Sequence, residues 1–413
     1  MTQIQYRFPE IDFKLDSLDD LPAKLQELQR QGERIIPVRY DNRTAWLITG
    51  FADVADLLGN DVGVPAGPHY ARELDTFGKT LLHMQGEEHR RSKASFTPLF
   101  SVGAVRRMVE ASLLPLANGI IDRFEGKREI DLYVEYASPY SFRVISTILG
   151  IDVSRDEEQD FIDLLVSALQ TKDVDGASYE ERQARAGRAV DRLNAFLGPM
   201  IETRRSNPGD DLISFLVHNK VADRSVSDAE IRDYIRHTYI AGFDTTGLQI
   251  ANVMWTILSK EGLRDHLLAT PAARGPVLEE TIRVSPVTGL LARTIFTPTV
   301  VAGVELEVGS TVLMGVPGAN RDVNYFDHPD ALSEEKRAKP NLTFGRGTHF
   351  CLGTHLAKEE LRISLELLLT RLPGLRLVDL RQKMVGSMIR HVPNMRVAFD
   401  AVLPAKPTNE KLA

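Results

Sequence analysis

The feature that most constrains the fold is a long helical segment from residue 227 to about residue 260 that contains no proline. It begins with Ser227-Asp228-Ala229-Glu230, a capping box in which the Ser and Glu side chains satisfy backbone N–H groups at a helix start. Gly262 is placed to end the helix. A helix of this length spans about 50 Å, enough to cross a whole domain.

The middle of this segment contains residues that form helices poorly. Residues 241–246 read AGFDTT, with one glycine and two β-branched threonines. The glycine alone costs about 1 kcal/mol relative to alanine. Two explanations stay open. A second helix could cross closely here, or the helix could be distorted at a site where small side chains leave room for a ligand.

The rest of the chain predicts a mainly α protein with small β-sheets. Runs of alternating apolar residues predict strands, and longer periodic segments predict helices. The expected elements are a hairpin at residues 34–50 with strands Ile35–Tyr40 and Ala45–Thr49 around the turn 41–43, a loop at 59–80, mostly helices to about 290, β-structure at 291–316, a helix at 351–372 and a strand at Met395–Phe399.

Length and composition limit the classes of protein to consider. The 413 residues contain no linker-like stretch, which favours one domain over residues 1–413. The net charge of -7 argues against nucleic acid as a partner. No apolar stretch reaches the roughly 18 residues of a membrane span, and the N-terminus lacks a signal-peptide pattern. We therefore expect a cytoplasmic protein with no membrane partner.

Cys351, the single cysteine, lies in the segment 344–353, FGRGTHFCLG. An amphipathic helix is expected directly after it, and a helix N-terminus stabilises a thiolate. Gly345 and Gly347 allow the preceding backbone to turn tightly and approach a flat ligand. Gly353 removes a side chain that would collide with such a ligand, and His349 supplies a hydrogen-bond donor near the sulfur.

Other interpretations of Cys351 are weaker. A lone cysteine is usually a small buried hydrophobe. A structural zinc site would need further ligands, and the chain has no second cysteine. A Cys/His nucleophile is possible but does not explain the three glycines.

The chain resembles the cytochrome P450 family, whose bacterial soluble members carry a haem loop of the form FGxGxHxCxG. Residues 344–353 match every fixed position of that form. Residues 241–246 resemble the family's oxygen-activating motif, 280–283 its ExxR motif and 319–322 its ANRD segment. The four motifs occur in the family's order and together extend the resemblance over nearly the whole chain.

The resemblance implies a cytochrome P450 fold and a haem b cofactor, with Cys351 as the axial ligand of the haem iron. It also implies the residues that surround the haem. Where the family usually has HxxxR, this chain has His89 and Lys93, and lysine lacks the bidentate fork of arginine. The implied cofactor-binding residues are His89, Lys93, Ala241, Gly242, Arg293, Phe344, Gly345, His349, Cys351 and Gly353.

Glu280 and Arg283 are expected to pair on one face of a short helix opened by Pro276 and closed by Ser285-Pro286. In the family this pair holds the fold around the haem loop. The family usually supplies a third partner from an arginine in a PxRF-like segment. This chain reads Pro-Asp-Ala-Leu at 329–332, so the third partner stays unassigned.

The activity implied by the resemblance is a monooxygenase reaction on an organic substrate. Thr245 would hydrogen-bond the reduced dioxygen and Asp244 would relay protons. The chain has no flavin or iron–sulfur motif, so the electrons are expected from a ferredoxin and its NAD(P)H-dependent reductase. Arg90 and Arg91 are either a solvated face or part of a basic surface for an acidic electron donor.

Two other functions of a haem-thiolate protein stay open. A peroxide-driven haem-thiolate enzyme would need no electron donor, and a haem-based binding or sensing protein would have no turnover. The retained Asp244-Thr245 pair argues against both.

By analogy with the family, the substrate pocket draws on the loop 59–85, helices around 160–205, the central helix, residues 287–291 and a late turn near 388–389. Their mostly apolar residues predict a small to medium hydrophobic substrate. His237 is either a structural histidine or an anchor for a polar group of the substrate. The candidate pocket residues are His237, Ile240, Val287, Leu290, Met388 and Ile389.

Overall fold

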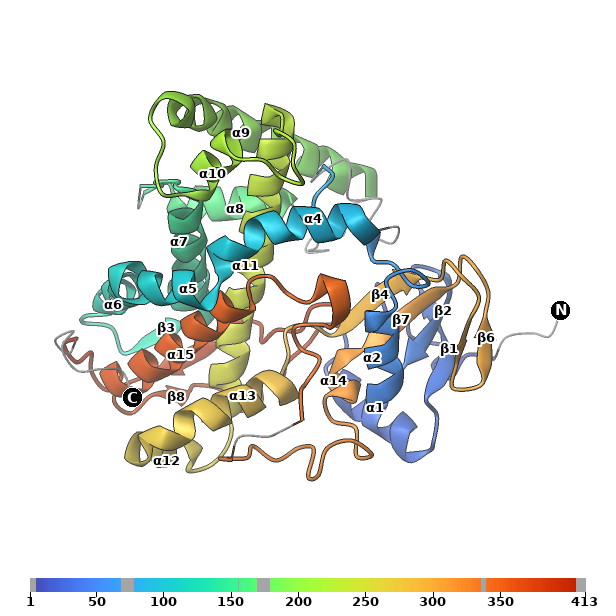
Figure 1. Ribbon diagram of the computed structural model, residues 1–413. Coiled ribbons are helices and arrows are strands. Elements are labelled where there is room, and N and C mark those ends of the chain that lie inside the picture. Colours follow the sequence, from blue (N-terminus) through green and yellow to red (C-terminus); the bar gives the residue numbers. More distant parts are fainter. Residues whose placement is uncertain (1–4, 68–77, 155, 169–178, 336–338, 406–413) are drawn as a thin grey trace.

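The structure of the chain is a computed structural model that describes residues 5–67, 78–154, 156–168, 179–335 and 339–405. A large helical part and a smaller part with most of the strands lie side by side (Figure 1). The expected fold class, mainly α with small sheets, is confirmed.

The helices occupy most of the chain between residues 86 and 284. The α-helices are α1 (Leu21–Arg30), α2 (Phe51–Gly59), α4 (Gly86–Phe96), α5 (Val102–Met108), α6 (Leu114–Asp122), α7 (Ser138–Leu149), α8 (Glu158–Ala168), α9 (Tyr179–Ser206), α10 (Leu212–His218), α11 (Asp228–Leu258), α12 (Leu263–Ala269), α13 (Arg274–Val284), α14 (Val316–Ala319) and α15 (Thr354–Arg371). Shorter helical turns are η2 (Thr97–Phe100), η3 (Val109–Leu113), η4 (Tyr133–Ala137), η5 (Pro271–Ala273) and η6 (Gly347–His349). Among the described residues, no helix is both long and apolar enough to cross a membrane.

The strands of the described residues form three small sheets, and two of these sheets join distant parts of the chain. They are β1 (Ile35–Tyr40), β2 (Arg43–Ile48), β3 (Glu129–Asp131), β4 (Leu290–Thr294), β5 (Thr299–Val301), β6 (Val304–Leu306), β7 (Thr311–Gly315), β8 (Arg376–Leu377) and β9 (Arg396–Ala398). The largest sheet has the order β1-β2-β7-β4, with β2 and β7 parallel and its other pairs antiparallel. The others are β3-β9-β8 and the hairpin β5-β6.

The expected hairpin at residues 34–50 is confirmed, with a tighter turn than expected. Ile35 pairs with Ile48 and Tyr40 with Arg43, so Arg43 belongs to the second strand. The two turn residues, Asp41 and Asn42, have φ values of 56° and 59°. Two consecutive left-handed residues make the two-residue turn that suits the twist of a hairpin.

The long helix α11 passes through the middle of the helical part (Figure 1). Its capping box is confirmed, because Ser227 accepts from the Glu230 N–H and Glu230 accepts from the Ser227 N–H. The helix ends at Leu258, so the prediction that Gly262 ends it is wrong. Gly262 has a φ of 73° and instead starts α12.

The glycine in the middle of α11 is explained by packing against α7. A Cβ on Gly242 would overlap the side chain of Ile145 on α7. A Cβ on Gly247, also on α11, would lie 3.0 Å from the hydroxyl of Ser141 on α7. Because α11 is continuous from Asp228 to Leu258, the structure supports a close helix crossing and shows no break in the helix.

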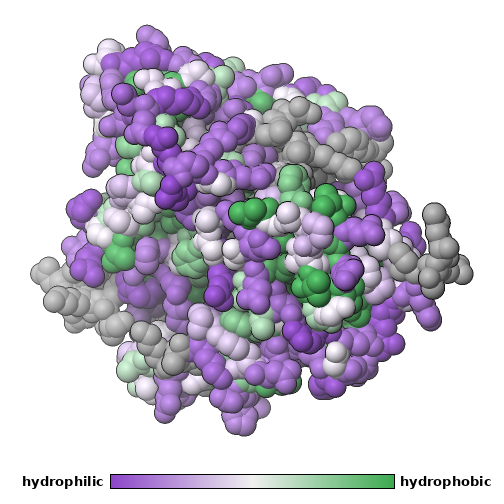
Figure 2. All heavy atoms as spheres, turned by 45° about the vertical axis from the view of Figure 1, so that its right-hand side comes forward, coloured by the Kyte–Doolittle hydropathy of each residue, from purple (hydrophilic) through white to green (hydrophobic). Residues whose placement is uncertain are grey.

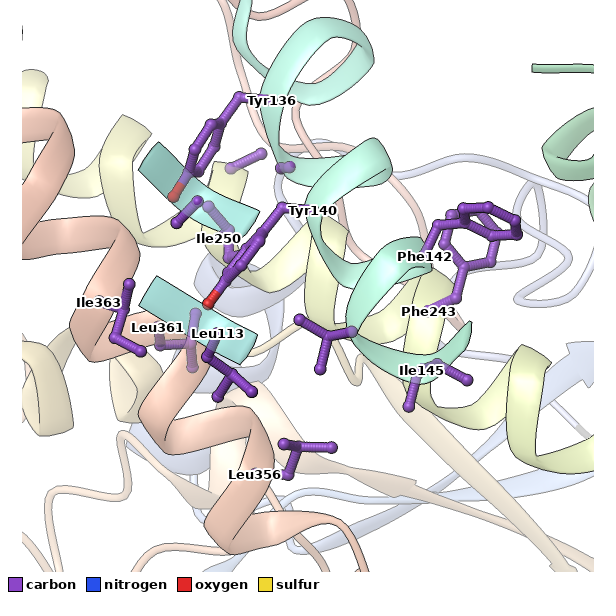
Figure 3. Packing of buried hydrophobic residues seen from close by; sticks show 14 of the residues in the cluster. Leu113, Tyr136, Tyr140, Phe142, Ile145, Phe243, Ile250, Leu356, Leu361 and Ile363 are labelled. Atoms are coloured by element: carbon purple, nitrogen blue, oxygen red, sulfur yellow. The ribbon is translucent and has the colours of Figure 1, made fainter. Parts of the chain in front are cut away.

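The largest hydrophobic core lies where α7, α11 and α15 meet. Phe142 and Ile145 come from α7, Phe243 and Ile250 from α11, and Leu361 from α15 (Figure 3). Two smaller clusters lie around the large sheet, one with α2 and one with α1. The loop before α15, which contains Cys351, lies between the helical core and this sheet.

Candidate active site

The loop that carries Cys351 is closed by its own backbone. The Cys351 N–H donates to the Phe344 carbonyl at 2.9 Å, and the Phe350 N–H donates to the Gly347 carbonyl at 3.1 Å. Gly345 and Gly347 have φ values of 74° and 73°, which favour glycine. A Cβ on Gly347 would also lie 2.8 Å from the Leu58 carbonyl oxygen, so the expected tight turn is present.

Cys351 lies three residues before α15 and is exposed, although protein atoms surround its sulfur on most sides. This surrounding protein raises the pKa of the thiol. The Gly353 N–H, the Thr354 hydroxyl and the charge of Lys93 act in the opposite direction. A Cβ on Gly353 would meet no protein atom within 4 Å, so protein packing does not explain that glycine.

Lys93 binds the Cys351 loop directly. Its Nζ donates to the carbonyl oxygens of Thr348 at 2.6 Å and Phe350 at 2.5 Å. The sequence suggested Lys93 as a partner of a haem propionate. In the structure this lysine connects α4 to the backbone on the N-terminal side of the cysteine. Its role towards a propionate stays a prediction.

His89 and His349 form a stacked pair beside this loop. Their ring centroids are 3.9 Å apart and inclined by 29°. His89 Nδ1 and His349 Nε2 are buried and have no hydrogen-bond partner among the described residues. Buried polar atoms without a hydrogen-bond partner are rare unless a ligand or an ordered water supplies that partner.

Burial and nearby positive charge keep both rings neutral. Desolvation lowers the pKa of His89, and Lys93 lowers it further. Desolvation, followed by the effect of His89, lowers the pKa of His349 to about 4, with a smaller contribution from Arg293. Asp61 opposes this shift from 3.6 Å, measured from Oδ1 to His349 Nε2. The histidines and Arg293 are thus brought together as expected.

Glu280 and Arg283 form a buried bidentate ion pair on α13. Arg283 Nε and Nη2 donate to the two Glu280 carboxylate oxygens at 2.9 and 2.8 Å. The remaining donors of Arg283 reach the carbonyls of Asn320 and Pro329, both at 2.7 Å, and of Ala331 at 3.1 Å. Backbone oxygens therefore satisfy the remaining donors of Arg283, and the third partner of the pair stays unassigned. The helix begins at Arg274, two residues before the expected start at Pro276.

Asn320 links this ion pair to the cysteine loop. Its side-chain amide donates to the Arg283 carbonyl at 3.1 Å and to the Thr343 hydroxyl at 2.9 Å. Its side-chain oxygen accepts from the Leu342 N–H at 2.7 Å. Asn320 therefore holds Leu342 and Thr343, at the start of the cysteine loop, in place against α13.

On α11, Ala241 is exposed and Thr245 and Asp244 are half-buried. The Thr245 hydroxyl donates to the Ala241 carbonyl at 2.7 Å, one helical turn back. Asp244 Oδ1 accepts a hydrogen bond of 3.0 Å from the hydroxyl of Tyr133. Exposure of an alanine in the middle of the central helix marks a place that protein side chains do not fill.

Comparison with known proteins decides the family. A cytochrome P450 family model matches residues 276–377. The mycinamicin IV hydroxylase/epoxidase of Micromonospora griseorubida is 31% identical over 345 residues, which cover 81% of this chain and 83% of that protein. The nocardicin C N-oxygenase of Nocardia uniformis is 31% identical over 374 residues, covering 86% and 89%.

The chain belongs to the cytochrome P450 family. As such, it is a haem-thiolate monooxygenase.

Solved structures show the same P450 fold. A Bacillus megaterium P450 in complex with testosterone has a TM-score of 0.82 and 22% identity, covering 93% of this chain and 100% of that one. The P450 of the Bacillus subtilis bacillaene polyketide synthase has a TM-score of 0.83 and 23% identity, covering 92% and 97%.

The residues present fit a haem. No group of three or more His, Cys, Asp or Glu in the described ranges could hold a metal ion, so Cys351 has no partners for a metal site built by protein alone. A porphyrin brings its own nitrogen ligands. The buried histidine nitrogens, which have no hydrogen-bond partner among the described residues, suit its propionates, and the open position at Gly353 leaves space beside the sulfur.

Two expected pocket segments of the P450 lie side by side. Gly289 N donates to the Met388 carbonyl at 2.8 Å, and Arg390 N donates to the Val287 carbonyl at 2.7 Å. Leu290, however, is buried in the core cluster with α1 and the sheet, and Met388 packs against the same cluster. Side chains alternate along a strand, so the opposite face of β4 carries Leu291 and Arg293. Leu290 is therefore a core residue.

The other candidate pocket residues differ in their exposure. Val287 is buried, Ile240 is half-buried and Ile389 is exposed. The loop 59–85 and the segment 160–205 lie partly outside the described residues. On the face in Figure 2, hydrophobic side chains gather near the middle, surrounded by hydrophilic ones.

His237 on α11 is held neutral by its surroundings. Burial, followed by the nearby His83, lowers its pKa to about 4. His83 itself lies against the Thr80 hydroxyl, 3.1 Å from its Nδ1. Two histidines from the segment before α4 and from α11 therefore face the same region.

The suggested basic surface at Arg90 and Arg91 is largely neutralised. Arg90 pairs with Glu87, and Arg91 pairs with Asp223. Both arginines are exposed, which fits the solvated-face interpretation.

Sequence reasoning missed Asp61 and Tyr133. Asp61 contacts the cysteine loop through Thr348 and His349, and Tyr133 contacts Asp244. Neither residue stands in a motif, and each reaches its partner across more than a hundred residues of chain. No signal in the sequence around them indicates these contacts.

Proposed function

We propose that Cys351 is the axial ligand of a haem b and that this P450 hydroxylates a small to medium hydrophobic substrate. The observation that carries the proposal is the placement of the only cysteine. It is accessible, lies directly before a long helix, and belongs to a loop bound by Lys93 and Asn320 from two other elements.

The residues around Cys351 would bind and orient the cofactor. A thiolate-ligated haem supplies the oxidising chemistry, because the thiolate donates electron density that favours O–O cleavage. His89, His349 and Arg293 would hold the propionates. Lys93 would hold the loop carbonyls, so the axial ligand keeps its position during turnover.

Thr245 and Asp244 on α11 would deliver protons to the reaction at the haem. The Thr245 hydroxyl already donates to Ala241, so its oxygen can accept a hydrogen bond from a proton donor beside the haem. Asp244, the residue before Thr245, would take protons from solvent and pass them on. Ala241 would leave space for dioxygen, while Gly242 is explained by α7.

His237 is the strongest candidate for an anchor of the substrate. A neutral imidazole offers one donor and one acceptor to a polar group of the substrate. Ile240 and Val287 would contribute apolar contact. A substrate that is mostly hydrophobic with one polar group fits these residues best.

We further propose that a separate ferredoxin and NAD(P)H-dependent reductase supply the two electrons. The chain carries no flavin or iron–sulfur motif of its own.

A single domain over 1–413 is supported by the large sheet, which combines residues 35–48 with residues 290–315. The cytoplasmic location expected from the sequence stays a prediction.

The test is the spectrum of the reduced holoprotein with carbon monoxide. The wild type is expected to show the far red-shifted Soret band of a thiolate-ligated haem, and Cys351→Ala is expected to lose it. A band at the position of a histidine-ligated haem in the wild type would overturn the assignment of Cys351.

The electron source is tested separately, with ferredoxin and reductase, with hydrogen peroxide alone, or with neither. Turnover only with the ferredoxin system supports the monooxygenase, and turnover only with peroxide supports the peroxide-driven alternative. A panel of hydrophobic ligands, screened by the Soret shift on displacement of the iron-bound water, would identify the substrate class.

A further inference from the structure

Tyr133 contacts α11, the helix that carries Asp244 and Thr245. It is the first residue of the helical turn η4, directly before α7. Its hydroxyl donates to Asp244 Oδ1 at 3.0 Å, across 111 residues of sequence. Asp244 immediately precedes Thr245 on α11, so the phenol reaches the acid of the candidate acid–alcohol pair.

The backbone of Tyr133 is fixed independently of its hydroxyl. Asp131 Oδ1 accepts hydrogen bonds from the N–H groups of Tyr133 and Val134, both at 3.0 Å. Asp131 itself belongs to β3 and pairs with Arg396 of β9. A Tyr133→Phe change therefore removes the hydroxyl and leaves these anchoring contacts in place.

The phenol acts as a hydrogen-bond donor and keeps its proton. Burial is the largest cause that raises the pKa of Tyr133 far above its usual range, and the charge of Asp244 is the next. At neutral pH the hydroxyl therefore stays protonated. Hydrogen bonds to an ionised acceptor are roughly twice as strong as those between neutral groups.

We propose that Tyr133 is a positioning residue that orients the Asp244 carboxylate for proton delivery. The inference rests on the proposed role of Asp244. A hydrogen bond from the Tyr133 hydroxyl to Oδ1 favours one orientation of this half-buried carboxylate over the others. Asp244 takes a proton from solvent and passes it on, and Tyr133 retains its own proton throughout.

The test compares Tyr133→Phe with Tyr140→Phe. Tyr140 is a fully buried tyrosine of α7, and its hydroxyl has no hydrogen-bond partner among the described residues. Its ring lies in the core beside Leu113 and Leu361 (Figure 3). The control therefore makes the same chemical change at a nearby site without removing a hydrogen bond.

The first readout is NADPH consumption by the holoprotein with dioxygen and a surrogate ferredoxin and reductase, in H2O and in D2O. Tyr133→Phe is expected to slow maximal consumption about tenfold or more, the loss of one hydrogen bond to a charged group, and to increase the solvent isotope effect. The ferredoxin concentration for half-maximal rate should not change. Tyr140→Phe should match the wild type in all three quantities.

The second readout does not depend on activity. Thermal unfolding of the holoprotein is measured for Tyr133→Phe, Asp244→Asn and the double variant. Because the two residues share a hydrogen bond, the double variant should lose less than the sum of the two single losses. Additive losses would overturn the contact. If the losses of stability are coupled but Tyr133→Phe has the wild-type rate and isotope effect, the hydrogen bond between Tyr133 and Asp244 has only a structural role. That result would overturn the proposal.

The same variants separate this inference from the proposed function. If Asp244→Asn slows turnover but Tyr133→Phe does not, Asp244 keeps its role and only the positioning by Tyr133 fails. If Asp244→Asn turns over like the wild type, the assigned role of Asp244 fails, and the inference about Tyr133 fails with it.

Discussion

Arg283 Nη1 donates a hydrogen bond of 2.7 Å to the carbonyl oxygen of Pro329, 46 residues further along the chain. The same guanidinium binds Glu280 with two other donors and stacks at 4.9 Å on the ring of Phe326. Only arginine has enough donors in a rigid fork to make all these bonds. The structure around the cysteine loop therefore depends on the shape of this side chain as well as on its charge.

Arg283→Lys is expected to lower the stability of the holoprotein. Lysine keeps the charge but cannot bind Glu280 and the carbonyls together, and disrupting a buried ion pair costs about 3–5 kcal/mol. Urea unfolding and the ratio of haem to protein measure the effect. Arg362→Lys is the control, because Arg362 and Glu359 form a partly exposed pair at the same spacing, at 2.9 Å. Equal losses in the two variants would contradict the special role of Arg283.

Gly242→Ala is expected to destabilise the α7–α11 crossing by about 1–3 kcal/mol, the usual cost of overpacking. The added methyl group would overlap Ile145. If packing is the reason, Ile145→Ala should recover part of the loss in the double variant, measured by urea unfolding. A Gly242→Ala variant of wild-type stability with impaired dioxygen binding would instead place Gly242 in the active site.

Glu360 on α15 is expected to make stability depend on pH. It is fully buried, neither carboxyl oxygen has a hydrogen-bond partner among the described residues, and burial raises its pKa well above the usual range. As the pH rises, the unfolded chain loses this proton first. The contribution of Glu360 is therefore complete below the ordinary glutamate pKa and decreases as the pH rises towards the folded value.

The measurement compares the unfolding free energy of wild type and Glu360→Gln from pH 4 to 8. The wild type should lose stability relative to the variant by up to about 1.4 kcal/mol per pH unit within that window. Glu359→Gln, at a half-buried neighbouring position, is the control. Parallel curves for wild type and Glu360→Gln would show that Glu360 is not protonated in the folded protein.

Thr245→Ala is expected to divert electrons into hydrogen peroxide while haem and ligand binding are retained, because the hydroxyl that serves proton delivery is lost. The measurement is peroxide formed per NAD(P)H consumed. Thr238→Ala is the matched control, since Thr238 on the same helix makes the same bond to the carbonyl four residues back, at 2.7 Å. If both variants couple like the wild type, Thr245 does not have the assigned role.

His237→Phe is expected to weaken binding of the true substrate about tenfold or less and to scatter the site of hydroxylation, because a neutral hydrogen bond contributes about 0.5–1.5 kcal/mol. Ligand affinity comes from the Soret shift and regioselectivity from product analysis, with haem content as the control. Because the pKa of His237 is about 4, its charge should not alter affinity between pH 6 and 8. Unaltered affinity and regioselectivity would leave a structural role only.

The sequence by itself determined the features that depend on residues close together in the chain. The capping box at Ser227, the hairpin around residues 41–43 and the glycines around Cys351 each follow from local backbone geometry, although the hairpin turn is one residue shorter than predicted. The Glu280–Arg283 pair follows from their spacing on one helix. For these features, local sequence was sufficient to predict the structure.

The tertiary structure alone decided the contacts between distant segments. It placed backbone carbonyls against the remaining donors of Arg283, directed Lys93 to the cysteine loop, and placed Gly242 against Ile145. It also placed Leu290 in the core and Tyr133 beside Asp244. Such contacts are set by how whole helices and strands pack, and a one-residue change of register on a strand turns a side chain from one face to the other. The spacing of residues along the sequence does not indicate how whole helices and strands pack against one another.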